Sequence, residues 1–321
     1  MRRTLLLLAA ALAACNTGFD PQYRVRDLRI LDVRSDAQAS PTSADVRPGD
    51  TLELAALVAN PQNRAGLTVD WFACLPQPSQ AVSPCLDVSY LQDPSRLAAG
   101  VGTLPGVVAL GSGLTVAYPV PETPDVDAAL AFVVGLAQSN PTYACRLYAE
   151  LDVVAVATAG GRQAVAYKRV PLLPPAIGGQ VCVPTTGAPI CATSQYVTNQ
   201  NPTVGDVRMN PSDQDACTGG TSIAPPPFPS GEVVLCALGG NGSSQPVNLC
   251  EPDGSITLAN ETVDWQWYAT DGDFPDDEGG VGDARGGHVK FQRPSGAFTL
   301  WTIVRDGRGG TDWAIFSYPS L

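Results

Sequence analysis

The densest group of potential metal ligands in the sequence is an acidic, glycine-rich segment between positions 271 and 283. Calcium favours clustered carboxylate and carbonyl oxygens, so Asp271, Asp273, Asp276 and Asp277 are candidate ligands. Their spacing lacks the later glutamate of an EF-hand loop. Aspartates also cap turns through their own backbone. The segment therefore fits either a structural calcium site or a solvated turn, and we expect no other cofactor.

A second group of interest is the set of aromatic residues near the C-terminus. Alternation along an extended strand places Trp265 and Trp267 on one face and Tyr268 on the other. One face must be buried, and the other offers an aromatic platform for sugars or protein side chains. We therefore predict a binding face at Trp265, Trp267 and Tyr268. Cross-strand aromatic pairs that cover a sheet are the alternative.

Residues for nucleophilic catalysis are sparse. His288 is the only histidine, and no Gly-x-Ser-x-Gly motif supplies a nucleophile. Paired carboxylates for glycoside cleavage depend on spacing in the fold, so an acidic chain always offers candidates. We expect no catalytic residue. The alternative is a carbohydrate-binding protein, or a carbohydrate-active enzyme that uses loop carboxylates of the C-terminal half.

The N-terminus has the zones of a secretory signal peptide. Arg2 and Arg3 precede an apolar run that is too short to span a bilayer. The run ends in Leu12-Ala13-Ala14-Cys15, which resembles the lipobox of bacterial lipoproteins. The resemblance implies that residues 1–14 are removed and that Cys15 carries a diacylglycerol anchor. Residues 15–22 would then be the lipidated cysteine and a polar tether of seven residues, Asn16 to Gln22, and Asn16 favours the outer membrane over the inner one.

Setting Cys15 apart leaves eight cysteines. An even number in an exported chain is typical of disulfides in an oxidising compartment. Many pairings are compatible with the sequence. Short spacing favours Cys74–Cys85, Cys182–Cys191 and Cys236–Cys250, which leaves Cys145–Cys217 by elimination. No Cys-x-x-Cys pair is present, so we expect no zinc site.

The chain contains 32 glycines and 29 prolines, which separate short apolar runs as turns separate strands. Alternating or β-branched patterns predict strands at 26–34, 51–59, 67–74 and 128–137. Residues 145–156 fit a strand or a helix. The first three strands, with Trp71 on the third, resemble strands A, B and C of immunoglobulin (Ig)-like sandwiches. No cysteine lies on the second strand, so the disulfide of antibody domains is absent.

The same landmarks recur in order in the second half. Thr68-Val69-Asp70-Trp71 returns as Thr262-Val263-Asp264-Trp265, and each half ends in a hairpin interrupted by glycines. A long repeat indicates two copies of one domain. We therefore predict an all-β protein with two tandem Ig-like β-sandwich domains after a lipoprotein signal peptide. The first domain spans 23–175 and contains an insertion, a linker spans 176–194, and the second domain spans 195–321.

The net charge of −12 and the presence of only two lysines exclude a basic surface for nucleic acid. The whole layout resembles Ig-like or PKD-like lipoproteins of bacteria, which mostly have no assigned activity. The resemblance implies a non-enzymatic protein of the cell envelope, attached to a membrane through its N-terminal lipid. Its domains would bind or brace a protein or glycan partner on the periplasmic or surface side of the outer membrane.

Overall fold

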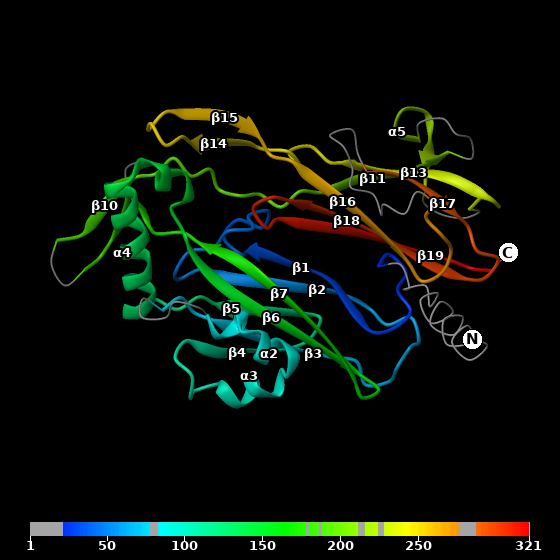
Figure 1. Cartoon of the computed structure of the whole chain (residues 1–321), viewed down its shortest axis with the longest axis horizontal. Helices are drawn as coiled ribbons and strands as arrows, with labels where there is room; N and C mark the ends of the chain where they lie inside the picture. The colour runs from blue at the N-terminus through cyan, green and yellow to red at the C-terminus, as the bar shows by residue number, and fades with distance from the viewer. Residues whose placement is uncertain are drawn as a thin grey trace, which may run out of the picture.

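The computed structural model describes residues 22–77, 83–177, 180–185, 188–210, 216–223, 228–275 and 287–320. Cys15, most of its expected tether, Asp276 and Asp277 lie outside these residues. The described chain is mostly β and forms two sandwiches of antiparallel sheets that lie against each other (Figure 1). The predicted all-β class is confirmed.

The first sandwich consists of a three-stranded and a four-stranded sheet. The first sheet has the order β1-β2-β5, and the second has the order β4-β3-β6-β7. These strands are β1 (Arg29–Ala37), β2 (Thr51–Ala59), β3 (Thr68–Cys74), β4 (Val107–Ser112), β5 (Thr115–Pro119), β6 (Ala149–Ala159) and β7 (Arg162–Leu172). The turn between β6 and β7 is Gly160-Gly161, and both residues have positive φ. That is the conformation that two-residue hairpin turns require.

The core of the first sandwich follows from the alternation of its strands. Leu52 and Leu54 of β2 point inward and meet Trp71, Leu151 and Val153 of the facing sheet, all at most 1% exposed. The indole nitrogen of Trp71 donates a hydrogen bond of 2.7 Å to the carbonyl of Gly113. Its polar atom is therefore satisfied inside the core.

The insertion in the first half contains helices rather than only strands. The short elements are η1 (Pro84–Leu86), α2 (Val88–Gln92), α3 (Ser95–Gly100) and η2 (Pro141–Arg146), and the long one is α4 (Pro124–Ser139). The strand predicted at 128–137 is thus wrong. Thr123 caps α4 by accepting from the Val126 amide, and Val126, Leu130 and Val134 form a buried stripe with helical spacing. The ambiguous segment 145–156 ends η2 and then enters β6 at Ala149.

The second sandwich repeats the strand order of the first. One sheet has the order β12-β11-β13-β17 and the other β16-β18-β19. These strands are β11 (Val204–Asn210), β12 (Thr221–Ser222), β13 (Glu232–Gly239), β16 (Val263–Ala269), β17 (Gly287–Gln292), β18 (Phe298–Asp306) and β19 (Thr311–Tyr318). The orders β1-β2-β5 and β11-β13-β17 correspond to A-B-E of an Ig-like sandwich. The orders β3-β6-β7 and β16-β18-β19 correspond to C-F-G.

Two small sheets and one short helix complete the structure. The linker forms a sheet that packs on α4, and a separate ribbon projects from the second sandwich toward the same end (Figure 1). The linker strands are β8 (Ala176–Ile177), β9 (Gln180–Val183) and β10 (Ile190–Thr193). The ribbon strands are β14 (Pro246–Cys250) and β15 (Ile256–Asn260), and the helix is α5 (Ala216–Gly219).

The disulfides confirm two of the four predicted pairs. Cys74–Cys85 and Cys182–Cys191 are present, whereas Cys236–Cys250 and Cys145–Cys217 are wrong. The structure instead has Cys217–Cys236 and Cys145–Cys250. Short spacing in the sequence gave the wrong partner for Cys236. This residue lies on β13 of the second sandwich, next to α5, and α5 contains its partner Cys217. Cys250 lies on the projecting ribbon and reaches η2 of the first half.

An apolar interface joins the two sandwiches. Leu31 and Leu57 of the first sandwich pack against Trp301 and Ile303 of β18, all at most 6% exposed. The segment that precedes β1 also runs along the second sandwich. The Val25 amide donates to the Ala269 carbonyl at 2.8 Å, and Tyr23 enters the core of that sandwich. The chain therefore contacts the second sandwich before it enters the first.

Candidate binding cleft

The predicted aromatic binding face is wrong. Trp265 and Trp267 are each 1% exposed and lie in the core of the second sandwich. The indole nitrogen of Trp267 donates to the Gly287 carbonyl at 3.0 Å. Tyr268, on the opposite face of β16, packs against the interface between the sandwiches, with the Arg29 guanidinium 5.4 Å from its ring centre. These residues therefore fit the alternative interpretation, in which aromatic side chains cover the face of a sheet.

The described part of the acidic segment is occupied by contacts within the protein. Asp273 accepts a hydrogen bond from the Tyr23 hydroxyl and lies 3.8 Å from Arg24, and Asp271 accepts from the Gly272 amide at 2.8 Å. Within the described ranges, no three acidic, histidine or cysteine residues are grouped as metal ligands would be. Asp276 and Asp277 lie outside the described residues, so the calcium site stays a prediction.

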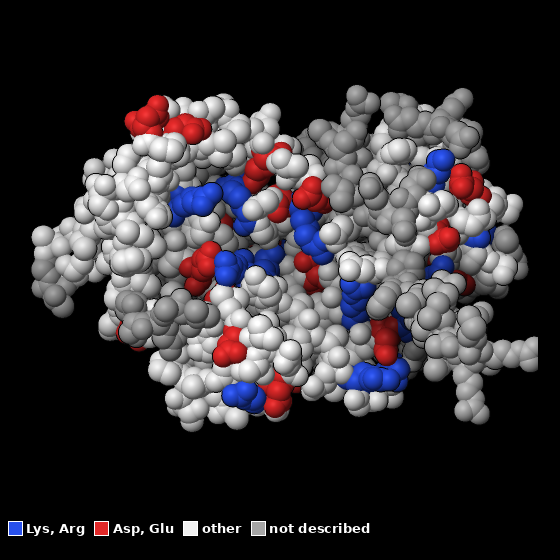
Figure 2. All heavy atoms as spheres, in the orientation of Figure 1, with Lys and Arg blue, Asp and Glu red and all other residues white. Residues whose placement is uncertain are grey.

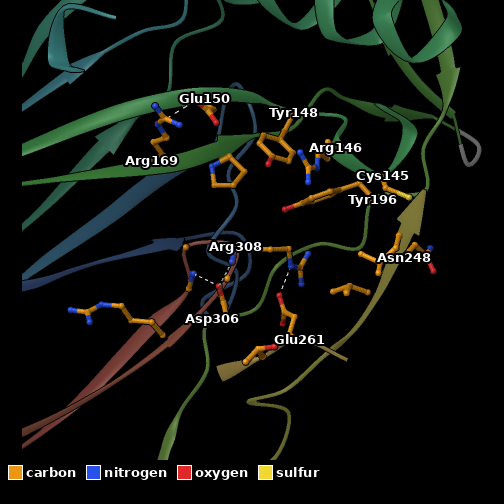
Figure 3. Close-up of a pocket in the computed structure, with 18 of the residues that line it drawn as sticks. Cys145, Arg146, Tyr148, Glu150, Arg169, Tyr196, Asn248, Glu261, Asp306 and Arg308 are labelled. Carbon is orange, nitrogen blue, oxygen red and sulfur yellow. Dashed lines mark hydrogen bonds and ion pairs between the residues drawn. The ribbon is translucent and has the colours of Figure 1, made fainter. Parts of the chain in front are cut away.

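A cleft of about 1100 Å³ lies between the two sandwiches. Its walls come from segments that are far apart in the sequence, as the close-up in Figure 3 shows. One wall consists of η2, the start of β6 and the edge of β7. The opposite wall consists of β14 and the turn between β18 and β19. Tyr196 also lines the cleft; it belongs to the linker, which in the structure extends from the end of β7 to the start of β11 and is thus longer than the predicted 176–194. Figure 2 shows basic and acidic side chains interspersed over the region between the sandwiches.

A disulfide holds the two walls together at one end of the cleft. Cys145 of η2 is bonded to Cys250 of β14 across 105 positions of sequence. The side-chain amide of Asn248 adds a hydrogen bond of 3.0 Å to the Gln195 carbonyl of the linker. The β14–β15 ribbon is therefore fixed to the first sandwich, although its chain continues into the second.

Three polar side chains form hydrogen bonds with the backbone at the free edge of β1. Every second backbone carbonyl of β1 from Leu31 to Ser35 accepts a side-chain hydrogen bond of 2.7–2.9 Å. The Leu31 carbonyl accepts from Arg305, the Val33 carbonyl from Lys168 and the Ser35 carbonyl from Asn201. An edge strand needs such partners because unpaired backbone groups invite pairing with other chains. Two of the three donors, Arg305 and Asn201, come from the second half of the chain.

Lys168 is the central residue of this group. Its ammonium donates to the carbonyl of Val33 in the first sandwich and to that of Gly309 in the second, at 2.8 and 2.5 Å. Burial lowers the pKa of Lys168 to about 8, and the nearby carboxylates Asp32 and Asp306 oppose that shift. The lysine thus connects β1, β7 and the β18–β19 turn.

The buried carboxylate of Asp45 forms hydrogen bonds with the linker next to the cleft. Asp45 is 2% exposed and accepts from the Tyr196 hydroxyl at 3.0 Å and from the Asn199 amide at 2.6 Å. Burial raises the pKa of Asp45 to about 6, while these hydrogen bonds act in the opposite direction. The ring of Tyr196 also meets Tyr148 edge-on, with 5.3 Å between the ring centres.

Arg308 joins the turn of the second sandwich to the linker. Its guanidinium donates to the Glu261 carboxylate, to the Val197 carbonyl and, at 3.2 Å, to Gln245. It also lies over the ring of Tyr196, 5.6 Å from the centre. The backbone of the same turn is held by Asp306, which accepts from the amides of Arg308 and Gly310 at 2.8 Å (Figure 3).

The charges that line the cleft are balanced. Five cationic side chains line it: Arg146, Lys168, Arg169, Arg305 and Arg308. Five carboxylates line it as well: Asp32, Glu150, Glu251, Glu261 and Asp306. Several are paired with each other, such as Arg305 with Asp32 at 2.9 Å and Arg169 with Glu150 at 3.4 Å. The cleft is therefore close to neutral in a protein whose net charge is −12.

Tyrosines supply the aromatic surface of the cleft. Four of the nine tyrosines line it: Tyr143, Tyr148, Tyr167 and Tyr196. Tyr143 on η2 and Tyr167 on β7 are 41% and 48% exposed. Burial raises the pKa of the Tyr148 hydroxyl above its ordinary value. Aromatic faces beside paired charges are suited to hold a ligand by stacking and hydrogen bonding.

Sequence reasoning missed this site. Tyr143, Tyr167 and Tyr196 stand in three separate segments, and no motif connects them. The glycine-rich turn at 307–310 was the one part of the site that the sequence indicated. Its glycines predict a tight hairpin, but they do not show which other segment the turn contacts. The correct pairing of Cys145 with Cys250 would have shown that η2 and the ribbon are neighbours.

Comparison with known proteins adds little to this picture. No protein-family model matches the chain, and no curated protein matches it. Among solved structures, fibronectin(III)-like modules of CbhA from Clostridium thermocellum align at 11% identity over 89% of this chain and 93% of that one, with a TM-score of 0.22. Tp47, the 47-kilodalton lipoprotein of Treponema pallidum, aligns at 9% identity over 94% of this chain and 53% of that one, with a TM-score of 0.21. The Ig-like assignment therefore rests on the strand order.

The four disulfides indicate an oxidising compartment outside the cytoplasm. Among the residues that the structure describes, no helix is both long enough and apolar enough to cross a bilayer.

Proposed function

We propose that the protein is a non-enzymatic lipoprotein of the bacterial cell envelope that binds an envelope or extracellular component in the cleft between its two sandwiches. One observation carries the proposal: the walls of the cleft belong to different sandwiches that are joined by Cys145–Cys250 and by buried side chains. A site whose walls are fixed before binding loses little conformational entropy when a ligand enters. Such a cleft is suited to binding, and the rigid pair of sandwiches is suited to bracing.

The membrane part of the proposal rests on the sequence. Cys15 would carry the lipid, and the tether would end at Tyr23, which is held in the second sandwich. The tether of seven residues spans at most about 25 Å when fully extended. The second sandwich would therefore stay close to the membrane, on the periplasmic or surface side of the outer membrane. No cofactor enters this proposal.

Site-specific photo-cross-linking in intact cells tests the binding site. A photo-reactive phenylalanine derivative replaces Tyr143 in the cleft, and in a control strain it replaces Phe132, which is 64% exposed on α4 outside the cleft. We expect one defined adduct, detected by protein and glycan staining, from position 143 and none from position 132. Equal labelling from both positions, or no adduct from position 143, would contradict the proposal.

Metabolic labelling tests the anchor separately. Cells that grow with radioactive palmitate should label the wild-type protein, and Cys15→Ala should abolish the label and release the protein from the membrane fraction. An unlabelled wild-type protein would overturn the lipid anchor, whatever the cross-linking result.

A further inference from the structure

We infer that the ligand of the cleft is an uncharged glycan chain, an inference that rests on the binding function proposed above. The first support is electrostatic. The five cations and five carboxylates that line the cleft cancel, although the protein as a whole carries a charge of −12. A polyanion or polycation needs an excess of opposite charge to be attracted and held. The cleft offers no such excess, so its polar surface suits a neutral ligand.

The second support is the chemistry of the ion pairs. Arg169 and Glu150 lie 3.4 Å apart at the edge of the cleft, and both side chains are almost half exposed. This pair presents N–H donors next to carboxylate acceptors at the same place. Every sugar hydroxyl both donates and accepts a hydrogen bond. Paired charges of this kind therefore match a chain of hydroxyl groups, whereas an apolar ligand would leave them unsatisfied.

The third support is aromatic. Tyr143 and Tyr167 keep 41% and 48% of their surface exposed although they lie within a concave site. In the same lining, Tyr148 and Tyr196 pack against each other, and the Arg308 guanidinium lies over Tyr196. Aromatic rings contribute a large, rigid contact area with a polar hydroxyl at one end. The apolar C–H faces of pyranose rings fit such surfaces.

The size of the cleft favours a chain over a small molecule. Its volume of about 1100 Å³ is at the upper end of the roughly 300–1,000 Å³ of sites that enclose small ligands. It is also open between the two sandwiches and fixed at one end by Cys145–Cys250. Several sugar units of a longer polymer can therefore lie in it while the rest of the chain extends outside.

Binding of defined oligosaccharides to the soluble mature protein tests the inference. The probes are an array of uncharged oligosaccharides, followed by calorimetric titration of those retained, with chitohexaose and cellohexaose included. We expect micromolar binding that weakens by less than about twofold between 50 and 500 mM NaCl, because no net charge is matched. Tyr143→Ala/Tyr167→Ala should weaken binding at least about tenfold, whereas Tyr143→Phe/Tyr167→Phe, which keeps the rings, should stay within about threefold.

The control is Phe132→Ala, which removes an aromatic ring that is 64% exposed and lies outside the cleft, and it should leave affinity unchanged. Circular dichroism establishes that every variant is folded. Three results would each overturn the inference. They are retention of no neutral oligosaccharide, an affinity of Tyr143→Ala/Tyr167→Ala equal to that of the wild type, and steeply salt-dependent binding of polygalacturonate or polylysine. Release of reducing ends during titration would instead overturn the proposed non-enzymatic function, because the protein would then be an enzyme, and the glycan ligand would stand. A protein adduct at position 143 would keep the binding function and reject the glycan.

Discussion

At the scale of single residues, the contact between the two sandwiches depends on a few buried or half-buried polar side chains that cannot be replaced independently. Lys168 bonds groups from two other segments of the chain and Arg308 groups from three, and Asp45 holds two residues of one segment, Tyr196 and Asn199. Removing one member of such a group leaves the others buried without a partner, and this costs more than the lost bond alone. Substitutions here should therefore have larger effects than substitutions of exposed ion pairs.

Asp45 should make stability depend on pH. Because its pKa is raised from 3.8 to about 6, the folded state binds more protons than the unfolded state between pH 4 and pH 6. This group therefore lowers the free energy of unfolding as pH rises through that range, by about 3 kcal/mol in total. Asp45→Asn should remove this dependence. Urea denaturation of both proteins at pH 4, 5, 6 and 7 measures the difference.

The control for this experiment is Asp87→Asn. Asp87 has a lowered pKa because it accepts from the Ser89 amide, so its contribution has the opposite sign and is lost as pH falls. If the curves of wild type and Asp45→Asn stay parallel from pH 4 to pH 7, Asp45 does not titrate in this range and the prediction fails.

Arg308 should be among the most sensitive residues of the interface. Arg308→Met leaves the Glu261 carboxylate, whose side chain is 4% exposed, without its cation. An uncompensated buried charge of this kind costs roughly 3–5 kcal/mol. Adding Glu261→Gln should restore most of the loss, because the charge is then absent. The exposed pair of Arg162 with Asp27 is the control, and Arg162→Met should change the free energy of unfolding by less than about 1 kcal/mol. Similar losses in both single variants would contradict this account.

At the scale of elements, strands with alternating burial could be predicted from sequence, and the elements of the insertion could not. The hairpins β6–β7 and β18–β19 have regular patterns and glycine turns, so both were recognisable. The apolar residues 128–137 fit a strand and a helix equally well by hydrophobicity. The deciding signal was Thr123-Pro124-Asp125, a capping threonine, a proline at the first helical position and an acidic first turn. That signal was in the sequence, and it outweighs the β-branched residues that follow.

The disulfides should differ in their effect according to the loops that they close. Cys145–Cys250 closes a loop of 105 positions and Cys182–Cys191 one of 9. In the chain-entropy description, these bonds stabilise by about 5 and about 3 kcal/mol. Cys145→Ser/Cys250→Ser should therefore lower the free energy of unfolding more than Cys182→Ser/Cys191→Ser. Hydrogen exchange should also show faster exchange of β14 and β15 amides in the first pair only. Equal effects would mean that the ribbon is held without its disulfide.

At the scale of the whole molecule, the duplicated strand order was accessible from sequence, but the relation between the two copies was not. Repeated landmarks identify strands within each sandwich, because those strands follow local hydrophobic patterns. The cleft depends instead on contacts such as Lys168 with Gly309 and Asp45 with Asn199, which join positions more than 100 residues apart. No periodicity encodes such pairs. The sequence pattern therefore does not single out Tyr143 and Tyr167, and it points instead to Trp265, Trp267 and Tyr268, of which the two tryptophans are buried.

The extent of this interface predicts that the two sandwiches unfold together. An apolar cluster, side chains bonded to the edge of β1 and the Cys145–Cys250 disulfide all connect them. Scanning calorimetry of the wild-type protein should show one transition whose calorimetric and van't Hoff enthalpies agree. Removing the disulfide together with Lys168→Met and Asn201→Ala should separate it into two transitions, because each sandwich keeps its own core. The control combines the same disulfide removal with Lys290→Met, on β17, and should retain one transition. Two transitions in the wild-type protein would show that the sandwiches are independent, and the cleft between them would then not be preorganised.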